Sequence, residues 1–97
     1  MQEALGIIET RGYATAMEAA DAAVKAANVH LGEPVMVGGG KVNVIFRGDV
    51  AAVKSALESG VMAAARIGEV QGQTVIPRPA DKVAKSFPIS VKPAVKK

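Results

Sequence analysis

Four stretches of the sequence carry the apolar pattern that is typical of β-strands, and each is closed by residues that break regular structure. Residues 4–10 are ended by Arg11-Gly12, and residues 35–37 lead into three consecutive glycines. The third stretch, residues 41–47, ends at Gly48-Asp49, and the fourth, residues 70–76, ends at Pro77-Arg78-Pro79. The strands predicted from this pattern cover residues 4–10, 35–37, 41–47 and 70–76.

An amphipathic helix is predicted between the first and second strands. Thr15 and Glu18 have the spacing of a capping box, in which the threonine caps the helix and the glutamate reaches back. The helix is expected to continue to about His30, before Gly32 and Pro34 end it. Its apolar positions recur three and four residues apart, and they are Met17, Ala20, Val24 and Ala27.

A second helix is predicted between the third and fourth strands. Asp49 directly precedes it and is suited to cap its first turn. Lys54 and Glu58 fall on its polar side, and the helix should end near Ile67-Gly68 because glycine commonly terminates helices. The predicted apolar face consists of Val50, Val53, Leu57, Val61 and Ala64.

The order of these elements is β-α-β-β-α-β, which predicts a ferredoxin-like α+β fold with an antiparallel sheet and both helices on one face. Residues 1–80 are expected to form this domain, and residues 81–97 to form a C-terminal extension. The extension is expected to contain a short helical turn around Asp81 to Ser86, followed by a mobile, lysine-rich tail. This fold has many functions, so the fold alone does not identify one.

Composition narrows the functional classes. The chain has 97 residues, of which 49% are hydrophobic and only three are aromatic, and this suits one domain with many small apolar side chains. The net charge of +3 comes from the extension, because residues 1–80 contain seven basic against eight acidic residues. Nucleic-acid binding requires clustered basic residues with aromatic side chains among them, so we expect no nucleic-acid partner.

The residue types also argue against an enzyme or a metalloprotein. The chain contains no cysteine, which excludes disulfides, thiolate metal ligands and cysteine nucleophiles. His30 is the only histidine, and Glu9 and Glu69 lack the features of a catalytic pair. No apolar run approaches the length of a membrane-spanning helix, and no signal peptide is recognised. We therefore expect a cytosolic protein with no catalytic site, metal, cofactor or membrane association.

Several local motifs follow one another in order and without a gap over about residues 3–80, and they are Ala4–Gly12, Glu18–Asp21, Lys25–Val29, Gly38–Gly40, Arg47–Val53, Gly68–Val70 and Ile76–Pro79. Together these motifs resemble bacterial microcompartment shell proteins of the single-domain, hexamer-forming class. The sequence departs from that pattern at Pro34-Val35-Met36, where relatives commonly carry charged residues, and at Gly39, which is often serine.

The resemblance implies a homohexamer that tiles, with neighbouring hexamers and other shell paralogues, into the facets of a microcompartment in the bacterial cytoplasm. Encapsulated cargo enzymes would be further partners, and small polar metabolites would pass through a central pore. On this basis Gly38, Gly39 and Gly40 are expected to line the pore. Lys25, Asn28 and Arg78 are expected to lie at the edge between hexamers.

Other interpretations of the same residues remain open at this point. A lysine on a polar helix face is most often simply solvated, and three glycines also suit an ordinary hairpin loop. Lys41, next to the glycines, is a candidate for a positive charge near the pore. For the whole chain, the alternative function is a ferredoxin-like regulatory domain that binds a small molecule.

Overall fold

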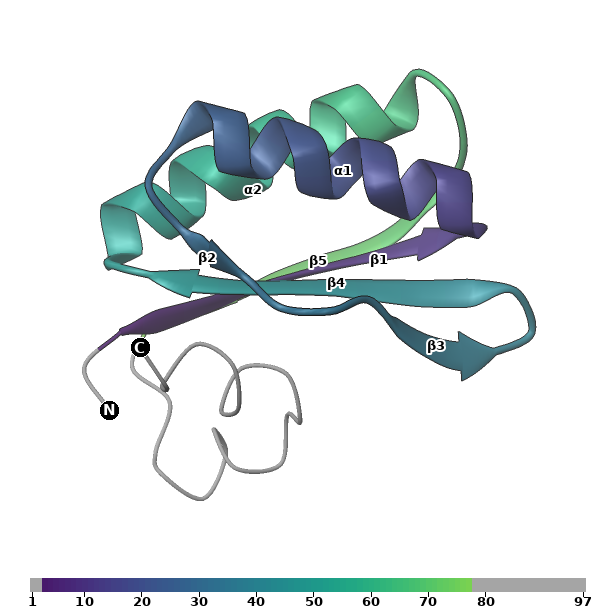
Figure 1. The fold of residues 1–97 in the computed structure, drawn as a ribbon, viewed down its shortest axis with the longest axis horizontal. Helices are drawn as coiled ribbons and strands as arrows, with labels where there is room; N and C mark the ends of the chain where they lie inside the picture. Colours follow the sequence, from purple (N-terminus) through teal and green to yellow (C-terminus); the bar gives the residue numbers. More distant parts are fainter. Residues whose placement is uncertain (1–2, 78–97) are drawn as a thin grey trace.

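In the computed structural model, which describes residues 3–77, strands and helices follow one another in the predicted order with one extra strand (Figure 1). The bounds of the elements are β1 Ala4–Arg11, α1 Tyr13–Ala26, β2 His30–Leu31, β3 Val35–Gly38, β4 Lys41–Gly48, α2 Val50–Ala65 and β5 Val70–Ile76.

The strands form one antiparallel sheet in the order β2-β4-β1-β5, and β3 also pairs with β4. The central ladder joins β1 to β4 over their whole length, from Ala4 opposite Gly48 to Arg11 opposite Lys41. Both helices lie on the same face of this sheet (Figure 1). The predicted ferredoxin-like α+β fold is therefore confirmed.

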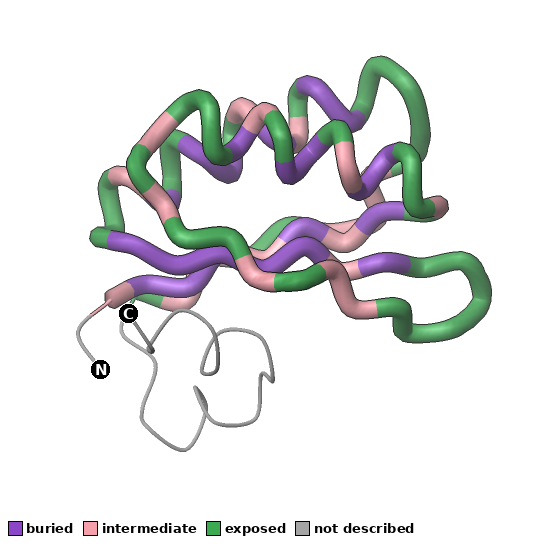
Figure 2. Tube along the Cα trace, viewed as in Figure 1, coloured by how far each residue is buried: buried purple, intermediate pink, exposed green. Residues whose placement is uncertain are grey.

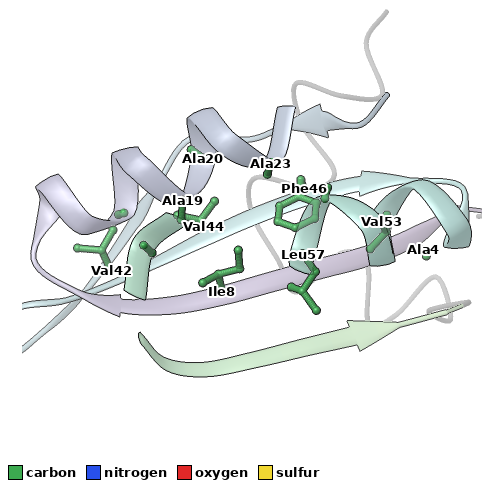
Figure 3. Packing of buried hydrophobic residues seen from close by; sticks show 13 residues of the cluster. Ala4, Ile8, Ala19, Ala20, Ala23, Val42, Val44, Phe46, Val53 and Leu57 are labelled. Carbon is green, nitrogen blue, oxygen red and sulfur yellow. The ribbon is translucent and has the colours of Figure 1, made fainter. Parts of the chain in front are cut away.

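The core lies between this sheet and the two helices. Gly6 is opposite Phe46 in the β1–β4 ladder. A Cβ atom at Gly6 would lie 2.9 Å from a methyl group of Val53 in α2. The even-numbered positions of β1 and β4 therefore face the helices. Alanines provide most of the helical contribution, with Phe46 as the largest buried side chain (Figure 3). Small residues let the elements approach closely. At Gly60 in α2, a Cβ atom would lie only 2.9 Å from the carbonyl oxygen of Ala19 in α1.

The predicted ends of the first helix are wrong. The helix begins at Tyr13 after Gly12, which has a φ of 89° and provides no side-chain cap. Thr15 is therefore inside the first turn and buried, and the capping box does not form. The helix ends at Ala26 because His30 and Leu31 pair with the end of β4 as the short strand β2.

The predicted apolar face is largely confirmed for α2, whereas the predicted face of α1 is rotated from the buried one. In α1, Val24 is exposed, and Ala23 beside it is buried instead. In α2, Val50 is exposed, whereas Val53, Leu57 and Ala64 are buried as predicted. The hydrophobic pattern could not place the buried face of α1 because alanine fits both a packed and an exposed helix surface. The buried helical residues are Thr15, Ala16, Ala19, Ala20 and Ala23 in α1, and Val53, Ala56, Leu57, Gly60, Ala63 and Ala64 in α2.

The other boundaries agree more closely with expectation. The Asp49 side chain accepts a hydrogen bond from the Ala52 N–H at 2.9 Å, which confirms the predicted cap of α2. Strand β5 covers the predicted residues. The expected helical turn around residues 81–86 and the expected mobile tail lie outside the described residues.

Replacing Gly6 with alanine is expected to destabilise the fold by about 1–3 kcal/mol, since overpacking a filled core forces its neighbours to move. The new Cβ atom would lie 2.5 Å from Cε2 of Phe46, whose ring is almost fully buried. Gly72→Ala is the matched control, because its Cβ atom would meet only Glu9 atoms at 3.7 and 3.8 Å. Thermal unfolding of both variants measures the difference, and equal melting temperatures would contradict this account of the core.

Candidate pore loop and edge surface

The hairpin loop between β3 and β4 consists of residues that only glycine suits well. Gly38, Gly39 and Gly40 have φ values of 96°, 63° and 81°, a region that other L-residues rarely adopt. The loop is exposed at one end of the molecule (Figures 1 and 2). No atom lies within 4 Å of the position that a Cβ atom would take at Gly38 or Gly39. The predicted hairpin is confirmed, and the loop has open space around two of its glycines.

Both carbonyl oxygens at the tip of this loop are hydrogen-bonded back to the domain. Arg11 Nη1 donates to the Gly39 oxygen at 2.9 Å, and the Gly12 N–H donates to the Gly40 oxygen at 2.7 Å. Among the described residues, the N–H groups of Gly39 and Gly40 have no acceptor. The tip of the loop therefore offers backbone donors to its surroundings, while its acceptors are occupied.

Arg11 is itself held in place by Glu69, which directly precedes β5. Arg11 Nε lies 3.5 Å from Glu69 Oε1, and the backbone N–H of Arg11 donates to the Glu69 oxygen at 3.0 Å. Sequence reasoning did not associate either residue with the glycine loop. The available signal was the strand register, since the antiparallel ladder places Arg11 opposite Lys41, directly after the glycines.

The carboxylates and the lysine near the loop are paired. Lys41 Nζ lies 3.8 Å from Glu9 Oε2, so its charge is balanced locally. Glu9 and Glu69 each contact a different cation and do not form a pair with each other. Elsewhere, burial lowers the pKa of the Arg47 guanidinium, which pairs with the Glu3 carboxylate and remains charged at physiological pH.

Lys25 and Asn28 lie at the opposite end of the domain from the glycine loop. Lys25 is in the last turn of α1, its side chain is 73% exposed, and its Nζ is 3.0 Å from Asp21 Oδ2. Asn28 is also exposed, and a Cβ atom at Gly48 would lie 3.2 Å from its carbonyl oxygen, at the far end of β4. The structure therefore brings these two predicted edge residues to the same end.

The sheet register gives the separation between the two ends. Gly38 is opposite Lys41 in the β3–β4 ladder, whereas Gly48 lies beside Asn28. At about 3.3 Å per residue, the strand from Lys41 to Gly48 spans roughly 23 Å. Strand β5 ends at Ile76, on the Lys25 side, because Ile76 pairs with Leu5 in the same row as Arg47 and His30. Arg78 lies outside the described residues.

The two long sides of the domain between these ends carry exposed apolar side chains. On the side formed by β3, Met36 and Val37 are 63% and 50% exposed. On the side formed by α2 and β5, Met62 is 58% exposed and contributes to an open groove of about 400 Å³. The groove is lined by Lys54, Leu57, Glu58, Val61, Met62 and Gln73. Because the two sides carry different residues, each side is suited to contact a different partner surface.

Within residues 3–77, no cluster of histidine, aspartate or glutamate has the arrangement of a metal site. No helix in this described range is both long and apolar enough to cross a membrane. The features that stand out are thus the glycine loop, the two apolar sides and the Lys25 end.

Fold and loop define a small α+β domain with a glycine-rich hairpin at one end, and comparison with known proteins identifies its family. The model of the BMC domain matches residues 4–79. The chain belongs to the BMC-domain family.

The relatives are shell proteins of bacterial microcompartments. The chain is 54% identical to the shell protein PduA of Citrobacter freundii, over 90% of this chain and 94% of that protein. It is 52% identical to the shell protein EutM of Salmonella typhimurium, over 93% of this chain and 94% of that protein. It is also 44% identical to the carboxysome shell protein CcmK2 of Thermosynechococcus vestitus, over 98% of this chain and 95% of that protein. The resemblance to microcompartment shell proteins is confirmed.

A solved structure supports the same conclusion. The crystal structure of a microcompartment protein from Desulfitobacterium hafniense superimposes with a TM-score of 0.76 at 36% identity. The match covers 87% of this chain and 46% of that protein, so the chain spans under half of its length. This protein is accordingly a microcompartment shell protein, and its relatives are structural proteins.

Proposed function

We propose that this chain forms cyclic homohexamers whose glycine loops line a pore on the six-fold axis. The observation that carries this proposal is the placement of the Gly38–Gly40 loop and of Lys25 at opposite ends of the domain. In a ring, each subunit has one end at the central axis and the other end at the rim. A loop that lines the pore and a lysine at the rim must therefore lie at opposite ends of the domain. The 1–80 domain then forms the tile, and residues 81–97 are an extension of it.

The exposed apolar side chains on the two long sides of the domain support assembly into a ring of subunits. The side with Met36 and Val37 and the side with Met62 have different residues, so contact between copies would be head-to-tail. A head-to-tail contact closes into a ring when the rotation between subunits permits it. Burial of these side chains between subunits would also supplement a core built largely from alanine.

The rim of the ring would connect hexamers into flat facets. At a two-fold seam each surface residue meets its own copy, and the long apolar stem of Lys25 can pack there while its ammonium binds a carbonyl group across the seam. Asn28 would support this contact, and Arg78 would reach across the same seam. The facets, together with other shell paralogues, would enclose cargo enzymes in the bacterial cytoplasm.

The pore would be passive and open to small polar metabolites. With no side chain at Gly39, the opening is formed by backbone groups, and it should be wider than one that carries serine. The chain itself would perform no chemistry.

Light scattering after size-exclusion chromatography, followed by electron microscopy of the same sample, tests this proposal. A hexamer mass together with flat sheets, tubes or regular arrays is the expected result. A stable monomer, dimer or trimer that never forms arrays would overturn it. Saturable binding of a small molecule by such a species would instead favour the regulatory-domain alternative.

A further inference from the structure

We propose that Arg11 is a positioning residue that determines which backbone groups the glycine loop presents, and hence which solutes the pore favours. This inference rests on the proposed pore function. Arg11 lies at the end of β1, on the domain side of the loop, and it does not have to contact a solute. Its role is to hold the loop in one of several orientations that glycines allow.

Glycines alone cannot fix the orientation of the peptide groups in this loop. Three consecutive residues without Cβ atoms have little steric preference between positive and negative φ, so each peptide group can rotate at low cost. A rotated peptide group would exchange an outward N–H for an outward carbonyl. A loop that presents N–H groups and carbonyl groups in fixed directions therefore needs a contact with residues other than its glycines.

Two hydrogen bonds provide that contact. Arg11 Nη1 binds the Gly39 oxygen at 2.9 Å, and the Gly12 N–H binds the Gly40 oxygen at 2.7 Å. Both occupied groups are acceptors, whereas the N–H groups of Gly39 and Gly40 have no partner among the described residues. Six such loops around an axis would form a ring of donors, which favours solutes with acceptor oxygens such as carboxylates and phosphates.

The position suits arginine rather than lysine. The guanidinium group is planar and donates in several fixed directions, so one side chain binds the Gly39 oxygen through Nη1 while Nε faces Glu69 Oε1 at 3.5 Å. The contact with Glu69 thus keeps the Arg11 guanidinium group directed at the loop. A lysine at this position would retain the charge but lose the bridge between Glu69 and Gly39.

Amide NMR of the intact, perdeuterated chain, titrated with inorganic sulfate at fixed ionic strength, tests this inference. In the wild type, sulfate is expected to shift the amide resonances of Gly39 and Gly40 in a saturable way. Arg11→Lys and Glu69→Gln are each expected to weaken this binding by roughly two- to fivefold, as loss of one such hydrogen bond predicts.

Glu69→Gln separates positioning from simple charge. Removal of a negative charge beside the loop would strengthen sulfate binding if only electrostatics mattered, whereas loss of positioning weakens it. Binding that is unchanged or tighter in Glu69→Gln, unchanged binding in Arg11→Lys, or no saturable shift in the wild type would each overturn the inference.

Light scattering on the same samples distinguishes the two proposals. If the wild type forms hexamers but its loop amides ignore sulfate, this inference fails and the proposed shell function stands. If no hexamer forms while the variants still weaken sulfate binding, the proposed hexameric pore fails and the positioning role of Arg11 remains.

Discussion

Replacing Lys25 with alanine is expected to leave hexamers intact and to abolish their assembly into sheets at the concentrations where the wild type forms them. Lys25 lies at the end of α1 with a side chain that is 73% exposed, and its loss removes no contact with the core. Because the glycine loop and the apolar sides are elsewhere, the ring itself should be unaffected. The expected defect is confined to the contact between hexamers.

Repetition makes the effect large. An exposed polar contact is worth about 0.5 kcal/mol, and a hexamer carries six copies of Lys25, so a tile would lose about 3 kcal/mol in total. That loss corresponds to roughly a hundredfold increase in the protein concentration at which sheets appear. Electron microscopy over a concentration series, with light scattering to verify the hexamer, measures the change.

Asp21→Ala is the matched control for this prediction. It removes the ion pair at 3.0 Å within the same helix and leaves the lysine in place. Sheets should persist in this variant, because the proposed partner of the ammonium is a carbonyl group of the neighbouring hexamer. Sheet formation by Lys25→Ala at wild-type concentrations would show that the edge assignment is wrong.

Replacing Gly39 with leucine is expected to slow the passage of polar metabolites by about tenfold or more, since a hydrophobic constriction in a pore excludes water. The loop has room for a side chain, because no atom lies within 4 Å of the Cβ position. Six leucines would converge on the axis and replace a polar opening with an apolar one. Product formation by enzymes inside an assembled shell measures the flux.

The control must account for the backbone, because Gly39 has a φ of 63°. Leucine in this left-handed region costs about 1–2 kcal/mol, whereas asparagine adopts it more readily. Gly39→Asn should therefore keep the loop conformation and a polar opening, with a smaller loss of flux. Assembled shells of Gly39→Leu with wild-type flux would contradict the pore role.

The sequence predicted the strands and the buried face of α2 better than the buried face of α1, and the reason is physical. Strand β5 and the hairpin are marked by prolines and glycines, which have strong conformational preferences. In α1, alanine dominates, and its small side chain gives little indication of which face is buried. Strand β2 was missed because two residues carry no periodicity, and only pairing with Arg47 and Phe46 defines it.

The candidate site was predictable in part. The glycine loop and Lys25 were chosen as candidate site residues through their resemblance to known motifs, and their location at opposite ends required the sheet register. Arg11 and Glu69 were missed because Arg11 is distant in sequence from the loop that it contacts, and Glu69 is distant in sequence from Arg11. Their roles depend on β1 and β5 being neighbours, which no local pattern encodes.

The interruption of the edge strand by Pro34 bears on how such a protein avoids misassembly. A shell protein must associate through its sides at high local concentration, and exposed strand edges are templates for fibrils. Here the outer edge beside β4 is divided into β2, with two residues, and β3, with four, and the proline between them has no N–H to offer. Along this edge, a strand from another copy would find no continuous row of partners, so extension of the sheet from molecule to molecule is disfavoured there.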